Sequence, residues 1–248
     1  MPNYTPDRKT ARLAGTALAL ASVLAIAGFT ALGSVFAYPQ ILHEPTSDIL
    51  ALFREQQRAV MSWFGVLIVG AALMAPAGLW IGRLVGGTLG RGIAAAGVLA
   101  AVVQVVGLQR WLTIVPAISQ DALDPSRRVS AEQRFELWHT VLGAGIGETV
   151  GYTLTALFTV LLVLGLRRSL LRRWLAVAGL IAAGLIATGV VVPLIPAASL
   201  TNFAGYILWC AWLLAVAVVL FRVPPIESTR AAAPTAAPQR RHAAARPY

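Results

Sequence analysis

Six long apolar runs follow one another along the chain, separated by shorter polar segments. They cover roughly residues 13–37, 60–82, 92–112, 139–166, 174–195 and 203–221. Each run can cross a hydrocarbon layer about 30 Å thick, because a spanning helix needs about 20 residues. None alternates strictly between apolar and polar residues, as a membrane barrel strand would. Since helices satisfy their own backbone inside lipid, the pattern predicts an all-α polytopic bundle of six transmembrane helices.

The polar ends of the chain enclose one membrane domain. Residues 1–12 are expected to form a basic arm, and residues 13–222 the six-helix domain. The tail, residues 223–248, is rich in Ala, Pro and Arg, a composition typical of disorder. The first run is longer than the about 7–15 apolar residues of a signal peptide, so we expect it to remain as a span.

Composition and charge support this class. Hydrophobic residues make up 58% of the chain and charged residues only 12%, whereas soluble domains carry about 25% charged residues. The net charge of +10 would suggest nucleic acid for a soluble basic domain. Here the basic residues lie in short loops and tails, where they set membrane orientation. We therefore expect the lipid bilayer, and no nucleic acid, as a partner.

The basic residues also predict the topology. Alternation of the spans places the N-terminal arm, the loop with Arg83 and Arg91, the loop 167–173 and the C-terminal tail on one side. That side holds 14 of the 20 basic residues. Because basic residues concentrate in cytoplasmic loops, both termini are expected in the cytoplasm.

Tryptophans and the outer loops add local expectations. Two tryptophans, Trp209 and Trp212, lie inside the last run, and the other five lie near run ends, where indole rings prefer the membrane interface: Trp63, Trp80, Trp111, Trp138 and Trp174. Residues 46–58 mix apolar and charged positions and predict a short helix on the outer surface. Ser130 followed by Gln133 resembles a capping box, so we expect the fourth helix to begin at about residue 131.

Glu148 is the acid that lies well inside an apolar run. An ionisable side chain within a span is costly and by default indicates a functional site. Tyr152, Thr155 and Thr159 follow at helical spacing, so one polar face should point into the bundle. The alternative is a carboxyl group that only locks neighbouring helices together.

A buried polar cluster is expected around this carboxyl group. Gln104 in the third run and Glu148 in the fourth lie roughly 10 and 15 Å below the outer aromatic belt, at 1.5 Å per residue. Tyr206 on the last run lies at a shallower but reachable level, and Tyr152 lies one turn from Glu148. We predict that Glu148, Gln104, Tyr206 and Tyr152 meet inside the bundle.

Gly143, Gly147 and Gly151 recur every four residues around this site. Small residues at this spacing allow another helix to approach closely, so they predict a packing seam.

The remaining residues give only weak evidence for a metal site or a catalytic site. Glu136 and His139 form one Glu-x-x-His pair, and His43 with Glu44 could join it, but carboxylate metal bundles need two such pairs and further glutamates. Cys210 is the single cysteine. We therefore predict no catalytic set, no metal site and no cofactor.

Three stretches resemble a bacterial family of six-span integral membrane proteins catalogued only as a domain of unknown function. They are residues 147–159 (GETVGYTLTALFT), 172–180 (RRWLAVAGL) and 205–214 (GYILWCAWLL). The resemblance covers most of residues 10–222 and implies six helices in a bacterial plasma membrane. It implies no activity and no catalytic residues.

The function therefore stays open between three classes. The leading interpretation is a non-enzymatic transport, sensing or accessory subunit with a Glu148-centred cluster, acting with a membrane protein partner or a second copy of itself. An intramembrane enzyme or redox component using Glu148 is the rival. A purely structural helix-packing module is the third.

Overall fold

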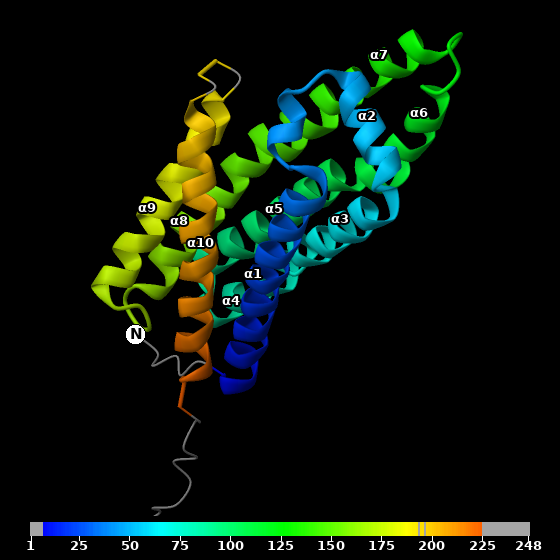
Figure 1. The fold of residues 1–248 in the computed structure, drawn as a ribbon. Helices are drawn as coiled ribbons and strands as arrows, with labels where there is room; N and C mark the ends of the chain where they lie inside the picture. Colours follow the sequence, from blue (N-terminus) through cyan, green and yellow to red (C-terminus); the bar gives the residue numbers. More distant parts are fainter. Residues whose placement is uncertain (1–6, 193, 196, 225–248) are drawn as a thin grey trace, which may run out of the picture.

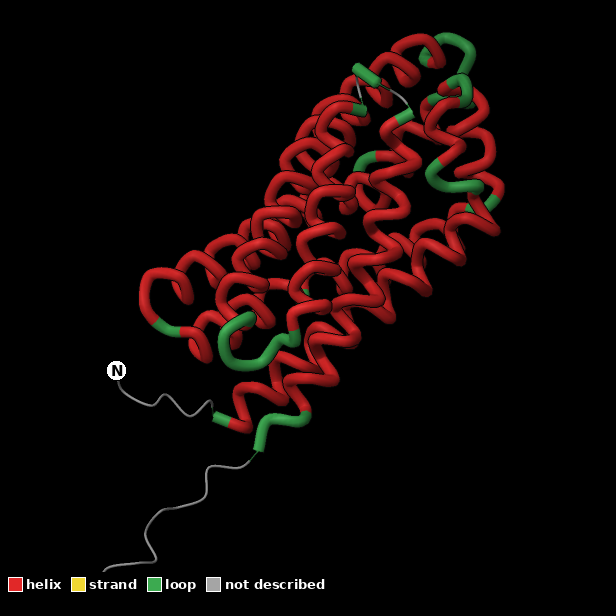
Figure 2. Tube along the Cα trace, turned by 90° about the vertical axis from the view of Figure 1, so that its left-hand side faces the viewer, coloured by secondary structure: helices red, strands yellow, loops and turns green. Residues whose placement is uncertain are grey.

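The computed structural model describes residues 7–192, 194–195 and 197–224, and these form a bundle of helices without strands (Figures 1 and 2). Two short segments, η1 and η3, are 3₁₀ helices, and η2 is a π-helix. In chain order the elements are α1 Arg8–Phe36, η1 Gln40–His43, α2 Thr46–Glu55, α3 Gln57–Ala72, α4 Met74–Val85, α5 Gly87–Thr113, α6 Val115–Asp121, α7 Arg128–Trp138, η2 His139–Val150, α8 Gly151–Leu166, α9 Arg173–Ala187, η3 Thr188–Val191 and α10 Ala198–Phe221.

Within these residues, six continuous helical stretches are long and apolar enough to cross a membrane. They are Arg8–Phe36, Gln57–Val85, Gly87–Asp121, Arg128–Leu166, Arg173–Val191 and Ala198–Phe221. The predicted all-α class with six spanning helices is confirmed. The predicted tail falls almost entirely on residues 225–248, outside the described residues.

The bundle has two distinct ends. The start of α1 and the end of α10 lie side by side (Figure 1), and Gly15 of α1 packs against Phe221 of α10. We call this the terminal end. The opposite end carries α2, α6 and α7, which contact one another and are here called the cap. Most loops gather at these two ends (Figure 2).

Local sequence explains how the first helix begins and stops. The Asp7 carboxylate accepts hydrogen bonds from the backbone N–H groups of Lys9 and Thr10, which caps α1. Ala37 ends the helix in the left-handed conformation, with φ of 48°. Pro39 follows and cannot continue a helix because it lacks a backbone N–H.

The cap differs from the sequence expectation in one detail. A helix near residues 46–58 is confirmed as α2, which ends at Glu55 before α3 begins. The capping box at Ser130 was wrong, because α7 already begins at Arg128 and Ser130 lies inside it. The turn before α7 is held instead by Asp124, whose carboxylate accepts from the backbone N–H and hydroxyl of Ser126.

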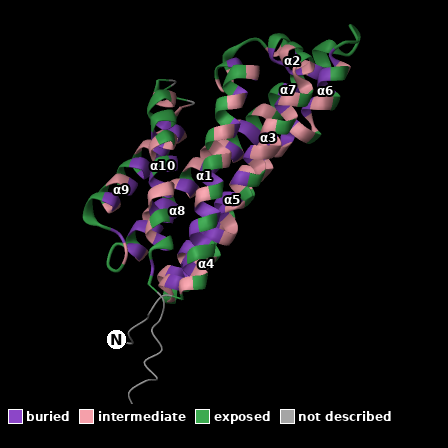
Figure 3. Ribbon diagram, turned by 60° about the horizontal axis from the view of Figure 1, so that its bottom comes forward, coloured by how far each residue is buried: buried purple, intermediate pink, exposed green. Residues whose placement is uncertain are grey.

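Two apolar cores fill the bundle, and buried residues line the helix faces turned towards neighbouring helices (Figure 3). The terminal-end core joins α1, α4, α5, α8, α9 and α10 and is rich in alanine and leucine. The cap-end core is rich in aromatic rings, and its buried members are Leu32, Phe36, Ile41, Ile49, Leu50, Phe53, Val60, Phe64, Leu67, Trp111, Val115, Ile118, Ala122, Ala131 and Phe135.

Trp111 is the centre of the cap-end core rather than an interface anchor. Its side chain is 0% exposed, and its ring stacks on Phe64 at a centroid distance of 4.9 Å. Phe36 contacts it edge-on at 5.2 Å. The interface prediction was therefore wrong for Trp111, because the cap helices cover the ring. Trp174, by contrast, is 63% exposed.

Candidate functional site beneath the cap

The glycine seam of the fourth span lies against α5. A Cβ added to Gly107 of α5 would lie 2.7 Å from the Cα of Gly147, and one added to Gly147 would lie 3.2 Å from the Cα of Gly107. Real Cβ atoms essentially never approach to 2.7 Å, and 3.2 Å is tighter than most real contacts, so the two backbones touch directly. Glycine at both positions allows this close crossing.

Polar side chains flank the crossing on both sides. The guanidinium of Arg110 lies over Gly143, where an added Cβ would be 2.8 Å from Nη2. The amide of Gln104 lies over Gly151, again 2.8 Å from an added Cβ. Gln104, Gly107 and Arg110 therefore form one face of α5, at a spacing of three residues. The glycines leave room for two polar side chains at a helix contact.

The seam lies in a π-helix, not in the regular α-helix that the apolar run predicted. η2 spans His139–Val150, and the Thr149 hydroxyl donates to the carbonyl of Ala144, five residues earlier, at 2.9 Å. Glycine has no Cβ and adopts more backbone conformations than other residues, so this glycine-rich segment tolerates the wider π-helical turn. Such π segments are rare and often occur at functional sites.

Arg110 is a buried cation at the cap end of the seam. Its side chain is 3% exposed, and its Nη1 donates to the carbonyl of Gly107. Its Nε is buried and has no hydrogen-bond partner among the described residues. Its guanidinium carbon lies 5.4 Å from the centre of the Trp111 ring. A guanidinium in this position needs an acceptor or an opposite charge, because burying a charge without a partner is costly.

Glu148 is the acid that faces this cation. The residue is partly buried, and its carboxylate interacts electrostatically with Arg110 and His43. Within the described chain it makes no salt bridge within 4.0 Å and no hydrogen bond. Tyr38, which follows α1, interacts electrostatically with both Arg110 and Glu148. The two charges therefore share one polar neighbourhood without closing on each other.

The remaining residues of the predicted cluster are Tyr152, Tyr206 and Gln104. The rings of Tyr152 and Tyr206 meet edge-on at 5.7 Å, and the Tyr206 hydroxyl is buried without a geometric hydrogen bond in the described chain. Gln104 and Thr155 are the polar side chains that lie beside that hydroxyl. Between Glu148 and Gln104 no direct hydrogen bond forms among the described residues, so the predicted cluster remains a prediction. We call Tyr38, Gln104, Arg110, Glu148, Tyr152 and Tyr206 the polar centre.

Three other polar side chains in the described spans have hydrogen-bond partners on neighbouring helices. The Trp209 indole donates to the Thr159 hydroxyl, and the Trp212 indole donates to the carbonyl of Leu175, both at 2.8 Å. The Asn202 amide donates to the carbonyl of Ile186 at 2.7 Å. These bonds join α8, α9 and α10, and they explain why tryptophan occurs inside the last span.

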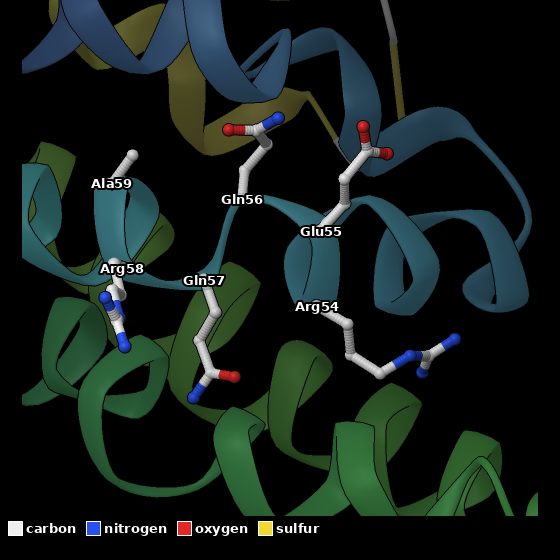
Figure 4. Close-up of a pocket in the computed structure, with 6 residues that line it drawn as sticks. All are labelled: Arg54, Glu55, Gln56, Gln57, Arg58 and Ala59. Carbon is white, nitrogen blue, oxygen red and sulfur yellow. The ribbon is translucent and has the colours of Figure 1, made fainter.

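A surface hollow lies apart from the polar centre, at the junction of α2 and α3 (Figure 4). Its lining comes from one consecutive stretch, residues 54–59. Arg54 turns towards α6, where it donates to the carbonyl of Ser119 at 2.8 Å, while Glu55 and Gln56 point the other way (Figure 4). Because one turn of chain forms the whole hollow, we assign it no function.

Comparison with known proteins assigns the chain to a protein family. A family model described as "Domain of unknown function (DUF4386)" matches residues 13–217. The chain belongs to this family. No curated protein and no solved structure matches the chain significantly. The DUF4386 match thus covers all six candidate spans in whole or in part and carries no activity with it.

Sequence reasoning missed Arg110 in this DUF4386 member. The residue lies in the last turn of the third apolar run, and it was counted with the basic residues of the outer loops. A usable signal was present, because Arg110 lies three residues after Gly107 and six after Gln104. That spacing places all three on nearly one helical face. The pairing of that face with the glycine seam could not be read from either run alone.

Proposed function

We propose that this chain is a multi-pass protein of a bacterial inner membrane, with both termini in the cytoplasm, and that it acts as a small transport or sensing subunit through its polar centre. The observation that carries the proposal is the pair of Arg110 and Glu148. The two side chains are buried or partly buried beneath the cap, interact electrostatically, and form no salt bridge among the described residues. A charge pair used only as a helix clamp would be expected to close, since an open pair loses its strongest attraction.

The functional groups of the polar centre support ligand binding rather than covalent catalysis. The polar centre offers one guanidinium, one carboxyl group, one amide and three phenol groups. These groups can bind an ion or a polar ligand and can accept or release one proton. Intramembrane ionisable residues of this kind line ion pathways and proton relays.

Infrared difference spectroscopy tests whether Glu148 exchanges a proton. The purified protein in lipid nanodiscs should show a carboxyl band that appears as pH falls and that is absent in Glu148→Gln. The matched control is Glu136→Gln, an exposed acid on α7, which should leave this band unchanged. A band that persists in Glu148→Gln, or no reversible band over the range in which the protein stays folded, would refute the proposal.

Reporter fusions test the orientation. Fusions after Arg91, Arg173 and Arg222 should report the cytoplasm, and fusions near Pro45 and Pro125 should report the outside. The physical reason is the concentration of basic residues on the first side. A periplasmic signal after Arg173 would contradict the orientation, because four arginines lie in that loop.

A further inference from the structure

The free edge of Arg110 is the starting point. A guanidinium presents two bidentate edges, and the side-on edge consists of Nε and Nη2. In this protein Nη1 is engaged by the carbonyl of Gly107, whereas Nε is buried without a partner and Nη2 makes no hydrogen bond in the described chain. Arg110 therefore keeps unused the edge that matches the two oxygens of a carboxylate.

The neighbours of this edge give it no hydrogen-bond acceptor among the described residues. Gly143 packs against Nη2 and brings no side chain. Two more buried ring nitrogens beside it, Trp111 Nε1 and His139 Nδ1, also lack partners among the described residues. His139 stacks on Phe135, and the Phe135 ring contacts Trp111, so these groups belong to one contiguous cluster. Polar atoms that the protein leaves unpaired are gathered where an external acceptor could satisfy them.

Charge balance then dictates what accompanies an anion. The titratable and charged groups that face Glu148 are Arg110 on α5, Tyr38 after α1, His43 on η1, Tyr152 on α8 and Tyr206 on α10. His139, at the start of η2, interacts electrostatically with Arg110 and His43. With Glu148 ionised, its charge offsets that of Arg110. An added anion would then face the Glu148 carboxylate at short range, which is strongly unfavourable in a low-dielectric site. A proton on Glu148 removes that repulsion.

We propose that the polar centre binds a small monocarboxylate anion on the Nε–Nη2 edge of Arg110, and that Glu148 takes up one proton with it. The proposal rests on the function proposed above and deepens it by naming the ligand class. No covalent step is involved, and the pair of anion and proton enters the site without net charge. Because linkage is reciprocal, the bound anion also favours protonated Glu148.

Titration calorimetry with acetate tests this directly. The full chain is reconstituted in zwitterionic nanodiscs, and acetate is added in buffers of different ionisation enthalpy, which reports the protons taken up per anion. We expect about one proton per acetate and an affinity that rises about tenfold for each pH unit lowered while Glu148 begins ionised. No acetate binding at any pH, or binding without proton uptake, would overturn the proposal.

Variants separate the roles of the two residues. Glu148→Gln mimics the protonated acid, so it should bind acetate with little pH dependence and without proton uptake. Arg110→Gln should weaken acetate binding by about tenfold or more, and Arg110→Lys should fold yet bind less tightly because a lysine lacks the bidentate edge. Loss of binding in Glu148→Gln, or unchanged binding in Arg110→Gln, would refute the mechanism.

Three controls define the source of the signal. His43→Gln should leave the proton count unchanged, and Arg58→Gln, on the surface of α3, should leave acetate affinity unchanged. Nanodiscs containing anionic phosphatidylglycerol distinguish a lipid headgroup from a free anion, and competition by that lipid would overturn the assignment to a small carboxylate. Because the infrared titration of Glu148 uses no acetate, it can succeed even if the anion proposal fails.

Discussion

The two ends of the bundle are packed by different means. At the terminal end, helices touch through small residues: a Cβ added to Gly82 of α4 would lie 2.5 Å from the carbonyl oxygen of Gly90 of α5. At the cap end, aromatic rings fill the space between helices, with Trp111 between Phe36 and Phe64. Small residues draw backbones together, whereas rings hold them apart. Beneath the cap the two kinds of contact meet, because Arg110 donates to the carbonyl of Gly107 at the glycine crossing and its guanidinium lies 5.4 Å from the centre of the Trp111 ring.

The two ends also differ in how many of their buried polar atoms lack hydrogen-bond partners. Among the described residues, the buried side-chain atoms without partners include Arg110 Nε, Trp111 Nε1 and His139 Nδ1, all at the cap end. The terminal end contributes Arg8 Nε. Unsatisfied polar groups cost free energy, so a protein retains them where a ligand, water or ion can complete them. The comparison teaches that most of these unpaired buried polar atoms gather at the cap end, next to the close contact of Gly107 with Gly147.

The largest effect is expected at Trp111, the ring at the centre of the cap-end core, which we call the aromatic hub. Trp111→Ala should lower the free energy of unfolding by about 3–5 kcal/mol, because it removes a fully buried ring and leaves a cavity. Trp174→Ala is the matched control, since that ring is 63% exposed and its loss should change stability little. Unfolding equilibria in mild detergent provide the measurement. Equal losses in both variants would mean that Trp111 is no hub.

The crossing of α5 and η2 is the next test. Gly147→Leu should lower the unfolding free energy by about 1–3 kcal/mol through overpacking, because even a Cβ there would lie 3.2 Å from Gly107. Gly184→Leu on α9 serves as the control, since nothing lies within 4 Å of a Cβ at that site. Thermal denaturation followed by size-exclusion chromatography reports the difference. A variant of Gly147 as stable as that of Gly184 would contradict close packing at the seam.

The sequence predicted the spans because each one carries its own signal. Apolar length and loop charge are local properties, so six helices and their approximate bounds could be read before any contact was known. The aromatic hub could not be read in the same way. Trp111 sits at the end of a run like Trp174 does, and only the cap folding over it distinguishes a buried ring from an interfacial one.

The polar centre was predicted in part for a similar reason. Glu148 stood out because a carboxyl group inside an apolar run is rare. Arg110 did not, since an arginine near the end of a run resembles a loop residue. Whether it snorkels to the interface or turns inward depends on which side chain the neighbouring helix offers. Here the neighbouring helix offers Gly143, whose missing side chain leaves room for the guanidinium, a property of the pairing and not of either sequence segment.

The smallest effect is expected at Asp124 and Ser126, two exposed residues in the turn between α6 and α7. The Asp124 carboxylate accepts from the Ser126 hydroxyl at 2.7 Å and from its backbone N–H at 2.9 Å, and these bonds lower the pKa of Asp124 below its usual value of 3.8. A lowered folded-state pKa means that the ionised form stabilises the turn above pH 3.8 and that this contribution disappears as pH falls through the folded-state value.

Asp124→Asn should therefore melt slightly below the wild type near neutral pH and approach it in strong acid, where the wild-type carboxyl is also uncharged. Ser126→Ala should act in the same direction, because it removes the bond from the Ser126 hydroxyl, the main cause of the lowered pKa. Thermal melting of each variant across pH gives the comparison. A gap between Asp124→Asn and the wild type that stays constant into strong acid would show that the charge of Asp124 does not hold the turn.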